Sequence, residues 1–375
     1  MAVRMKIFHV CPNFYPVRGG IETFVYELSK ELAGRGHDVT VITGNKIPGR
    51  KVKLASYSVK DVIKIHRFNF KKVSRYNTSI DALKFIMGSE FDILHIHGIG
   101  FFSDAIPLIK ASGYRKVVLS THGGIFHTKT MLTIKNIYFK TMARIAGKFA
   151  DAIIAVSRQD KKFMETVSDK EKIFLIGNGI EWKRLSRIKN SGDGRTLVYF
   201  GRLASSKRID NLLRVVKSVQ SKMKNVRIYV AGADWGEMNK LKKLATELGI
   251  KRNVTFTGEV SNNRLYNILS KSDAFLLASE YEGFGISVVE AMAAGLPVVV
   301  NNIETMKEIV TNGKNGYLVN YERPAAVAHV IVKLMKNKPL RRRIGIRARA
   351  YAKRLDWDVV AERIENVYKS LLEEK

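Results

Sequence analysis

Residues 274–300 read AFLLASEYEGFGISVVEAMAAGLPVVV, and the architecture of the whole chain can be worked out from this stretch. An apolar run is followed by a short loop with two glycines, then by apolar residues at helical spacing, and then by a second apolar run. Short apolar runs bounded by turns are typical of strands buried in a parallel sheet, with the crossover helix between them. The stretch therefore predicts a β–α–β unit.

The same alternation extends over the rest of the sequence and is typical of an α/β protein with parallel sheets. The principal predicted helices are 20–35, 129–150, 210–223, 236–248, 262–269, 286–294, the region after Pro324, and 357–375. The apolar runs that predict strands are 5–10, 37–43, 62–68, 92–98, 116–122, 152–157, 173–178, 196–202, 226–232, 254–260, 274–279, 296–302 and 316–319.

A chain of 375 residues is too long for one ordinary hydrophobic core, so we expect two domains. The polar segment Lys183–Thr196, which contains serine and glycine, is the best candidate for a linker. We predict an N-terminal Rossmann-like domain over 1–185 and a C-terminal one over 190–357, with a last helix at 358–375 that packs back on the first domain. Ligands bind at the carboxyl ends of strands in such sheets, so we expect both sheets to face a central cleft.

Composition excludes several classes of protein. Hydrophobic residues make up 46% and charged residues 26% of the chain, which indicates a globular protein. The single cysteine, Cys11, excludes a disulfide framework and a cysteine-based zinc site. No apolar run reaches the roughly 18–20 residues of a membrane span, and no signal peptide is evident. We therefore expect a cytoplasmic location.

The formal net charge is +31, and both halves of the chain carry it. Residues 1–185 contain 31 basic against 15 acidic side chains, and residues 186–375 contain 34 against 19. The densest basic stretches are Lys46–Arg75, Asp104–Asp151 and Lys336–Arg354. Each alone is adequately explained as a solvated surface, but together they favour an anionic partner, either a lipid surface or a nucleic acid.

Two predicted strands of the first half end in glycine-containing loops. VRGGIE at Val17–Glu22 lets backbone N–H groups of Gly19 and Gly20 approach an anion at a helix N-terminus, although a plain tight turn explains it equally well. THGG at Thr121–Gly124 places His122 at a strand end, where imidazole can bind a hydroxyl or transfer a proton. His95 and His97 are alternatives; as a pair two residues apart they share a strand face, but without nearby carboxylates we expect packing rather than a metal site.

Two motifs of the second half suggest binding of a diphosphate. In GRLASSKRID, Gly201–Asp210, the cations Arg202 and Lys207 lie between a strand and a helix, where they can clamp a pyrophosphate. In EGFGI, the glycines Gly283 and Gly285 free the backbone amides of Phe284, Gly285 and Ile286 for phosphate oxygens. The carboxylates of Glu282 and Glu290 can accept hydrogen bonds from sugar and ribose hydroxyls. The chain has no P-loop pattern.

Taken together, these motifs resemble glycosyltransferase family 4, whose members have the GT-B fold of two Rossmann-like domains. Three departures are Ala278, where proline is frequent, Arg208, where glycine usually follows the lysine, and Glu181, where aspartate is more frequent. The similarity covers nearly the whole chain and is most specific at the two glutamates eight residues apart. The other matching motifs are Gly19-Gly20, Thr121–Gly123, Ala155–Ser157, Asn178–Glu181, Gly201–Leu203 with Lys207, Ala231-Gly232 and Phe256–Val260.

The resemblance implies transfer of a hexose from a nucleotide diphosphate sugar, with retention of configuration and without a metal or other cofactor. It implies that Glu282 and His122 hold the donor sugar and that Glu290 holds the ribose. It also implies that Arg202 and Lys207 balance the diphosphate charge. Further implied donor-binding positions are Gly19, Gly20, Gly258, Gly283, Phe284, Gly285 and Ile286. The only Asp-x-Asp, at Asp356–Asp358, lies at the entry of the last helix, where a donor metal would be misplaced.

The acceptor is not determined by these residues. A glycan or lipid-linked acceptor at an anionic membrane would suit the basic segments Lys46–Arg75 and Lys110–Lys148, although helix 129–150 is better explained as packing on the core. We also consider a nucleotide-sugar epimerase of the same fold and a basic nucleic-acid-binding protein. The spaced glutamates and the Arg-Lys clamp favour transfer over both, and nucleic acid is not expected as a partner.

Overall fold

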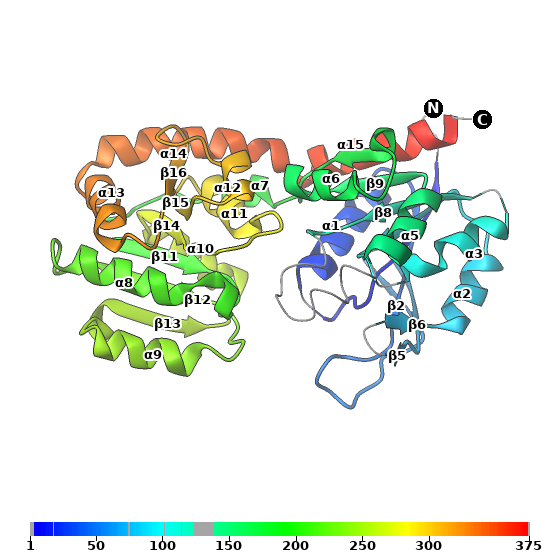
Figure 1. Cartoon of the computed structure of the whole chain (residues 1–375), viewed down its shortest axis with the longest axis horizontal. Helices are drawn as coiled ribbons and strands as arrows, with labels where there is room; N and C mark the ends of the chain where they lie inside the picture. Colours follow the sequence, from blue (N-terminus) through cyan, green and yellow to red (C-terminus); the bar gives the residue numbers. More distant parts are fainter. Residues whose placement is uncertain are drawn as a thin grey trace. The chain divides into compact units, whose positions relative to one another are not determined.

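The structure is a computed structural model that describes residues 4–17, 19–73, 76–100, 102–113, 115–123 and 139–373 (Figure 1). The chain divides into two compact units, each with its own parallel sheet. The first unit comprises residues 1–179 and 357–375, and the second comprises residues 180–356.

The first unit is built on an eight-stranded sheet in the order β10-β9-β8-β7-β1-β2-β4-β3. All neighbouring strands are parallel except β3, which runs antiparallel to β4 at the edge. This sheet comprises β1 (Lys6–Val10), β2 (Asp38–Gly44), β3 (Tyr57–Lys60), β4 (Ile63–Phe68), β7 (Ile93–His97), β8 (Lys116–Ser120), β9 (Ala152–Ala155) and β10 (Ile173–Leu175). A separate small hairpin consists of β5 (Lys71–Val73) and β6 (Tyr76–Thr78).

The two faces of this sheet differ in chemistry. Phe8, Leu94 and Leu119 belong to the apolar core on one face. Successive strand residues point to opposite faces, so the alternate positions His9 and His95 lie on the other face. Both histidines are completely buried. This second face is therefore also inside the unit, where Val41 and Val118 lie in register with the histidines and are equally buried.

The antiparallel strand β3 was not predicted. It joins β4 through a tight turn at Asp61 and Val62, and both residues adopt positive φ angles, of 47° and 62°. Such turns normally carry glycine or asparagine, because side chains are strained in this conformation. The sequence of this turn thus lacks the usual indication of a hairpin.

Three helices of the first unit, α1, α5 and α15, lie where helices were predicted, whereas α2, α3 and α6 were not predicted. The last helix, α15, packs against α1 within this unit, where Arg35 contacts the Glu365 carboxylate at 3.1 Å. Of the predicted helix 129–150, the part 129–138 lies outside the described residues, and 139–149 is helical. The helices are α1 (Gly20–Gly34), α2 (Ile80–Met87), α3 (Ile106–Ala111), α5 (Arg144–Phe149), α6 (Arg158–Met164) and α15 (Trp357–Glu373).

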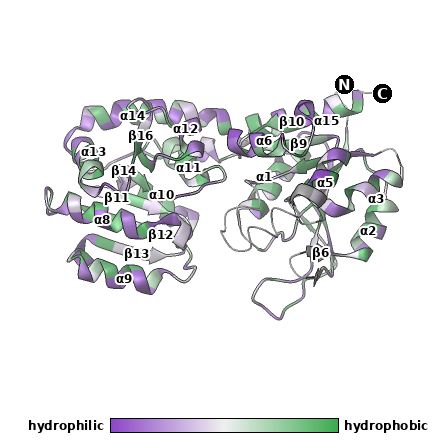
Figure 2. Ribbon diagram, in the orientation of Figure 1, coloured by the Kyte–Doolittle hydropathy of each residue, from purple (hydrophilic) through white to green (hydrophobic). Residues whose placement is uncertain are grey.

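The second unit has a six-stranded parallel sheet in the order β13-β12-β11-β14-β15-β16. Figure 2 shows green, hydrophobic strands such as β14 and mixed colours on α8 and α9, as expected for amphipathic helices that cover a sheet. Its strands are β11 (Thr196–Phe200), β12 (Arg227–Ala231), β13 (Val254–Gly258), β14 (Ala274–Leu277), β15 (Val298–Asn301) and β16 (Gly316–Val319). Its helices are α7 (Trp182–Leu185), α8 (Ile209–Gln220), α9 (Met238–Glu247), α10 (Asn262–Lys271), α11 (Ile286–Ala293), α12 (Glu304–Ile309), α13 (Pro324–Lys336) and α14 (Lys338–Ala352).

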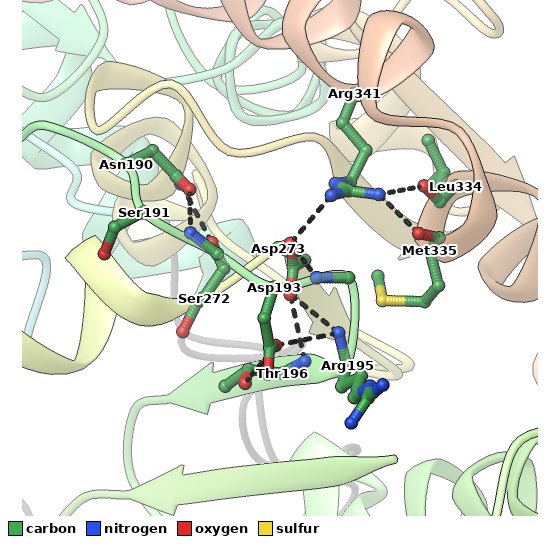
Figure 3. A network of polar contacts seen from close by, with 12 residues as sticks. Asn190, Ser191, Asp193, Arg195, Thr196, Ser272, Asp273, Leu334, Met335 and Arg341 are labelled. Carbon is green, nitrogen blue, oxygen red and sulfur yellow. Dashed lines mark hydrogen bonds and ion pairs between the residues drawn. The ribbon is translucent and has the colours of Figure 1, made fainter. Parts of the chain in front are cut away.

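The boundary between the units differs from the predicted one. It falls between Gly179 and Ile180, so the predicted linker Lys183–Thr196 lies entirely within the second unit. The reason is the buried carboxylate of Asp273, which accepts hydrogen bonds from the backbone N–H groups of Gly194, Arg195 and Thr196 at 2.9–3.0 Å (Figure 3).

The guanidinium of Arg341 completes this anchor. It lies 3.2 Å from Asp273 and also donates to the carbonyl oxygens of Leu334 and Met335 (Figure 3). Upstream, the Asn190 amide donates to the Ser272 carbonyl at 2.8 Å. A segment with so many anchoring contacts is not a free linker, in spite of its polar composition.

Candidate active site

Loops at the carboxyl ends of the second sheet hold most of the predicted donor-binding residues. Gly201, Gly232 and Gly258 end three adjacent strands, β11, β12 and β13, and the backbone N–H of Gly232 donates to the Gly258 carbonyl at 2.8 Å. At Gly232 the strands approach so closely that a Cβ atom would lie 1.8 Å from the Gly201 carbonyl oxygen. A side chain at Gly232 therefore does not fit between these strand ends, where backbone lies against backbone. Gly258 lies at the edge strand, and β12 and β11 separate it from β14.

Lys207 and Glu282 meet directly. The ammonium nitrogen of Lys207, in the loop before α8, lies 2.6 Å from the Oε1 of Glu282, in the loop after β14. Their side chains are only 15% and 10% exposed. Lys207 keeps two further N–H donors and Glu282 keeps its second oxygen, so both can bind a ligand while they remain paired. The structure thus brings together a cation and an acceptor that the sequence analysis assigned to phosphate and sugar.

Arg202 is held beside this pair by aromatic groups. Its guanidinium lies over the ring of Trp235, 4.6 Å from the ring centre, a cation–π contact. The buried Tyr199 hydroxyl donates to the Arg202 carbonyl at 2.9 Å and so fixes the backbone of the loop. Burial raises the pKa of Tyr199, and the charge of Glu282 raises it further. The charge of Glu282 can raise the pKa of Tyr199 only at short range, so Tyr199 lies near both Arg202 and Glu282.

The N-terminus of α11 supplies backbone donors. Gly285 precedes the helix with φ of 94°, a left-handed conformation that glycine adopts without strain. No side chain caps this helix end. Its first amides, at Ile286 and Ser287, precede the first hydrogen bond within the helix, from Val288 to Gly285, and therefore remain available to an anion.

Neighbouring side chains hold the EGFG loop in place. The Thr305 hydroxyl donates to the Glu282 carbonyl at 2.8 Å, and the Asn301 amide donates to the Ser279 carbonyl at 3.1 Å. Thr305 and Asn301 come from α12 and β15, so the loop is anchored by the next strand and helix of the sheet. Anchoring of this kind keeps the amides of the loop in position before a ligand arrives.

Glu290 lies on α11 near a second carboxylate. Burial raises the pKa of Glu290 to about 7, and the negative charge of Glu181 adds to this shift. Glu181 in turn accepts a hydrogen bond from the Tyr266 hydroxyl at 3.1 Å, and the guanidinium of Arg184 lies over the Tyr266 ring. Among the described residues the Glu290 carboxylate has no hydrogen-bond partner, which leaves both oxygens for hydroxyl groups of a ligand.

Arg208 does not join the cation clamp. It occupies a left-handed conformation at φ of 47°, which explains why glycine is favoured at this position. Its guanidinium binds the Asp210 carboxylate through two hydrogen bonds of 3.0 Å and also bonds to Glu280. Its charge is thus neutralised by acids, which leaves Arg202 and Lys207 as the cations of the predicted clamp.

The other predicted residues belong to the first unit. Gly19 and Gly20 follow β1 and start α1, where a Cβ on Gly20 would meet nothing within 4 Å. Neither glycine has a positive φ, so the backbone itself does not require glycine at these two positions. His122 follows β8 with φ of 53°, and its Nε2 lies 3.0 Å from the Nδ1 of His97. Gly124, at the end of the THGG motif, lies outside the described residues.

Several contacts of the candidate site in the second unit, and one contact beside His122 in the first unit, were not predicted from the sequence. Trp235 and Tyr266 contact Arg202 and Glu181, respectively. Trp235 could have been noticed as a tryptophan directly after a predicted strand, and it is 61% exposed. The contact of Tyr266 with Glu181 could not be foreseen, because 85 residues separate them. In the first unit, the hydrogen bond of His97 to His9 was missed for the same reason.

Comparison with known proteins identifies relatives over nearly the full length. Residues 18–184 match the model of the family described as Glycosyltransferase Family 4, and residues 180–351 match that of Glycosyl transferases group 1. A relative from Komagataeibacter xylinus, named GDP-mannose:cellobiosyl-diphosphopolyprenol alpha-mannosyltransferase, is 30% identical and covers 98% of this chain and 94% of its own length. The protein of the same name from Xanthomonas campestris is 29% identical, with 98% and 97% covered.

The fold agrees with this relationship. The solved structure of sucrose-phosphate synthase from Thermosynechococcus elongatus aligns with a TM-score of 0.81 at 18% identity, over 99% of this chain and 100% of the other. The fold and the site define the class of the protein: it is a glycosyltransferase with the GT-B fold that uses a nucleotide sugar. Within that class, the chain belongs to glycosyltransferase family 4. The comparisons support neither an epimerase nor a nucleic-acid-binding protein.

Proposed function

We propose that the protein transfers mannose from GDP-mannose to a lipid-linked glycan, with retention of anomeric configuration. The name of the relative that is 30% identical over nearly its whole length includes this donor and a diphosphopolyprenol acceptor. The mannose of GDP-mannose is α-linked, and that relative is an α-mannosyltransferase, so transfer by the same route retains configuration. The observation that carries the proposal for this chain is the Lys207–Glu282 pair beside the uncapped end of α11.

Each group of the second unit has a role in this reaction. Breaking the glycosidic bond leaves the negative charge of the departing diphosphate, and fixed positive groups lower the barrier if they already point at it. Arg202, Lys207 and the amides before α11 supply such groups. Glu282 would accept hydrogen bonds from the sugar, and Glu290 from the ribose diol.

In the first unit, we propose that His122 binds the donor sugar. Gly19 and Gly20 would line the side of the site that holds the diphosphate and the acceptor. Burial lowers the pKa of His122 to about 4, so its imidazole is neutral at physiological pH. A neutral ring can donate one hydrogen bond and accept another, as a sugar hydroxyl requires. At Gly20 the open space beyond Cα offers room for a ligand.

We further propose that transfer needs no metal ion. The cations and amides named above can balance the diphosphate charge without one. The Asp356 carboxylate of the Asp-x-Asp sequence already accepts a hydrogen bond from the Trp182 backbone N–H at 3.2 Å, which gives it a structural role. We expect activity to persist in excess EDTA. Loss of activity that Mg²⁺ or Mn²⁺ restores would contradict this part of the proposal.

A peripheral contact with anionic membrane would bring the enzyme to such an acceptor. No helix among the described residues combines the length and the apolar character that crossing a bilayer requires. The loop between β2 and β3 exposes Lys46, Arg50, Lys51 and Lys53, none of which forms an ion pair with a described residue, and Val52 between them is 57% exposed. Cations around an exposed apolar side chain suit an anionic lipid surface. Of the second basic segment, 110–148, residues 114 and 124–138 lie outside the described residues.

The donor can be tested by thermal unfolding with a panel of nucleotide sugars. A ligand that binds only the native state raises the unfolding midpoint. We expect GDP-mannose to raise it more than GDP-glucose, UDP-glucose or UDP-N-acetylglucosamine at equal concentration. A larger shift with a uridine donor would overturn the proposed donor while leaving the class of enzyme unchanged.

A further inference from the structure

Four histidines lie together on one face of the first sheet. His9 on β1 is paired in register with His95 on β7, and His97 on β7 with Ser120 on β8. Since residues two apart on a strand share a face, His97 lies on the same face as His95, and His122 follows two residues after Ser120. His9, His95 and His97 are completely buried. Buried imidazoles are costly unless they are hydrogen-bonded, so their partners define what they can do.

Three of these rings form a row of hydrogen bonds that ends at His122. The Nδ1 of His9 lies 2.9 Å from the Nε2 of His97, and the Nδ1 of His97 lies 3.0 Å from the Nε2 of His122. Burial lowers the pKa of His9 to about 3 and of His122 to about 4, and it lowers the pKa of His97 strongly. All three rings are therefore neutral, with one N–H each. In such a row every N–H must point in the same direction along it.

The inner end of the row determines that direction. The Nε2 of His9 is buried and has no partner among the described residues. A buried N–H without an acceptor is rarer in proteins than an acceptor without a donor. Nε2 of His9 is therefore the bare nitrogen, and its proton is on Nδ1. It follows that His9 donates to His97, that His97 donates to Nε2 of His122, and that the proton of His122 is on Nδ1.

We propose that His97, supported by His9, is a positioning residue that holds His122 as the Nδ1–H tautomer and thereby presents one N–H donor to an oxygen of the sugar nucleotide. The assignment of that ligand rests on the proposed function, whereas the tautomer does not. Among the described residues Nδ1 of His122 has no other partner. The ring plane is held by Phe24, whose edge-on contact has a centroid distance of 4.8 Å.

His95 provides a matched control within the same strand. It is as deeply buried as His97, and its ring lies against the ring of His97 with a centroid distance of 4.0 Å. Its nitrogens bond elsewhere, to the Tyr368 hydroxyl at 2.5 Å and to the Ser120 hydroxyl at 2.7 Å. Replacing His95 removes a buried imidazole next to the row without interrupting it.

A metal ion is the alternative occupant of this region. Ring nitrogens of His9, His95 and His97 all lie within 4.8 Å of one another. Both nitrogens of His95 are already in hydrogen bonds, however, and the facing nitrogens of His9 and His97 bond each other. These contacts favour the row of hydrogen bonds, because a metal would have to break all of them to gain three ligands.

The tautomer can be read directly from nitrogen NMR of the protein labelled with ¹⁵N-histidine, in the absence of substrate. We expect the His122 signals, assigned through His122→Gln, to show a protonated Nδ1 and a bare Nε2. The His97→Phe variant should move His122 to the Nε2–H tautomer that predominates in free histidine, whereas His95→Phe should leave it unchanged. A protonated Nε2 in the wild type would overturn the proposal. So would one equivalent of zinc that is bound by the wild type and lost in His97→Phe.

Activity provides a second readout once a donor is known. Loss of a residue that orients a functional side chain typically costs on the order of 10–100-fold, and we expect His97→Phe to lower kcat by that factor with little change in KM. The His97→Asn variant carries an amide N–H that can donate to Nε2 of His122, and it should recover most of the activity. Equal losses in both variants would reduce His97 to a space-filling role. The NMR spectrum needs no substrate, so failure of the proposed function would not obscure the result.

Discussion

The ammonium nitrogen of Lys207 and the carboxylate oxygen Oε1 of Glu282 lie 2.6 Å apart, although 75 residues separate them in the chain. The contact joins the loop after β11 to the loop after β14, two strands that are neighbours in the second sheet. It thereby places a cation for the diphosphate next to an acceptor for the sugar. This relationship is the core of the account, and its consequences can be measured.

Replacing Lys207 by alanine should reduce turnover strongly. Removal of one preorganised charge at a developing anion costs about 10²–10³-fold in kcat, and we expect a loss of this size. The measurement is initial rate against donor concentration. Lys217→Ala is the matched control, because the ammonium of Lys217, a half-buried lysine of α8, bonds to Gln220 and to no other residue that the structure describes, so it should be dispensable. Activity of Lys207→Ala equal to that of Lys217→Ala would remove Lys207 from the mechanism.

Glu290 should make nucleotide binding depend on pH. Its pKa is raised to about 7, and only the ionised carboxylate accepts hydrogen bonds from both ribose hydroxyls. We expect the Kd of GDP-mannose, whose diphosphate does not titrate in this range, to increase as the pH falls from 8 to 6, and this dependence to vanish in Glu290→Gln. Glu181→Gln removes the neighbouring negative charge, so it should shift the transition to lower pH. Titration calorimetry across this range tests both variants; identical profiles for wild type and Glu290→Gln would contradict the assignment.

A rise in pH should favour nucleotide binding through Glu290 but, through the same carboxyl, reduce the stability of the fold. A carboxyl whose pKa is raised by folding contributes stability that is present below the unfolded value, near 4.5, and is lost as the pH rises through 7. Relative to wild type, Glu290→Gln should therefore become more stable by roughly 1–3 kcal/mol between pH 4.5 and pH 8. Urea unfolding at several pH values measures this difference. A constant difference would show that the pKa of Glu290 is not raised.

Gly20→Ala should separate folding from function. No atom lies within 4 Å of the added Cβ, and alanine favours a helix over glycine, so stability should stay the same or rise by up to about 1 kcal/mol. Turnover should nevertheless fall at least about tenfold, because the methyl group occupies space that we assign to the ligand. Gly34→Ala, at the other end of α1, also meets no atom; it should affect stability as little as Gly20→Ala does and leave turnover unchanged. Full activity of Gly20→Ala would remove this loop from the site.

The loop between β2 and β3 should bind anionic lipid. Each well-placed cation contributes about 1 kcal/mol, so Lys51→Ser with Lys53→Ser should weaken binding to phosphatidylglycerol vesicles roughly 30-fold. Lys162→Ser with Lys170→Ser removes two exposed lysines of the same unit and should have a much smaller effect. Vesicle sedimentation at low and high salt gives both affinities. Equal losses in the two double variants would attribute binding to net charge and not to this loop.

The strands and their loops were predictable, because buried parallel strands are continuous apolar runs and each ends at a polar or glycine-rich loop. The β14–α11–β15 unit lies where the residues from Ala274 to Asn301 indicated. The motifs also identified Lys207 and Glu282 separately. Their contact depends on the strand order of the sheet, which local sequence does not contain.

What could not be predicted depends on contacts between distant segments. The supposed linker is held by Asp273, and the row of histidines forms only because β1, β7 and β8 are neighbours. Arg208 follows Lys207 in the sequence, but its backbone is left-handed and its guanidinium is bound by the acids Asp210 and Glu280. Composition gave no indication of any of these three arrangements.

The most direct test of the central claim is to incubate the purified enzyme with GDP-mannose and a polyprenol diphosphate-linked disaccharide, and to determine the product linkage by NMR. The account predicts an α-mannosylated product from the wild type and from Lys217→Ala, and at least about 100-fold less from Lys207→Ala. A β-linked product, or a product formed equally well without Lys207, would contradict it.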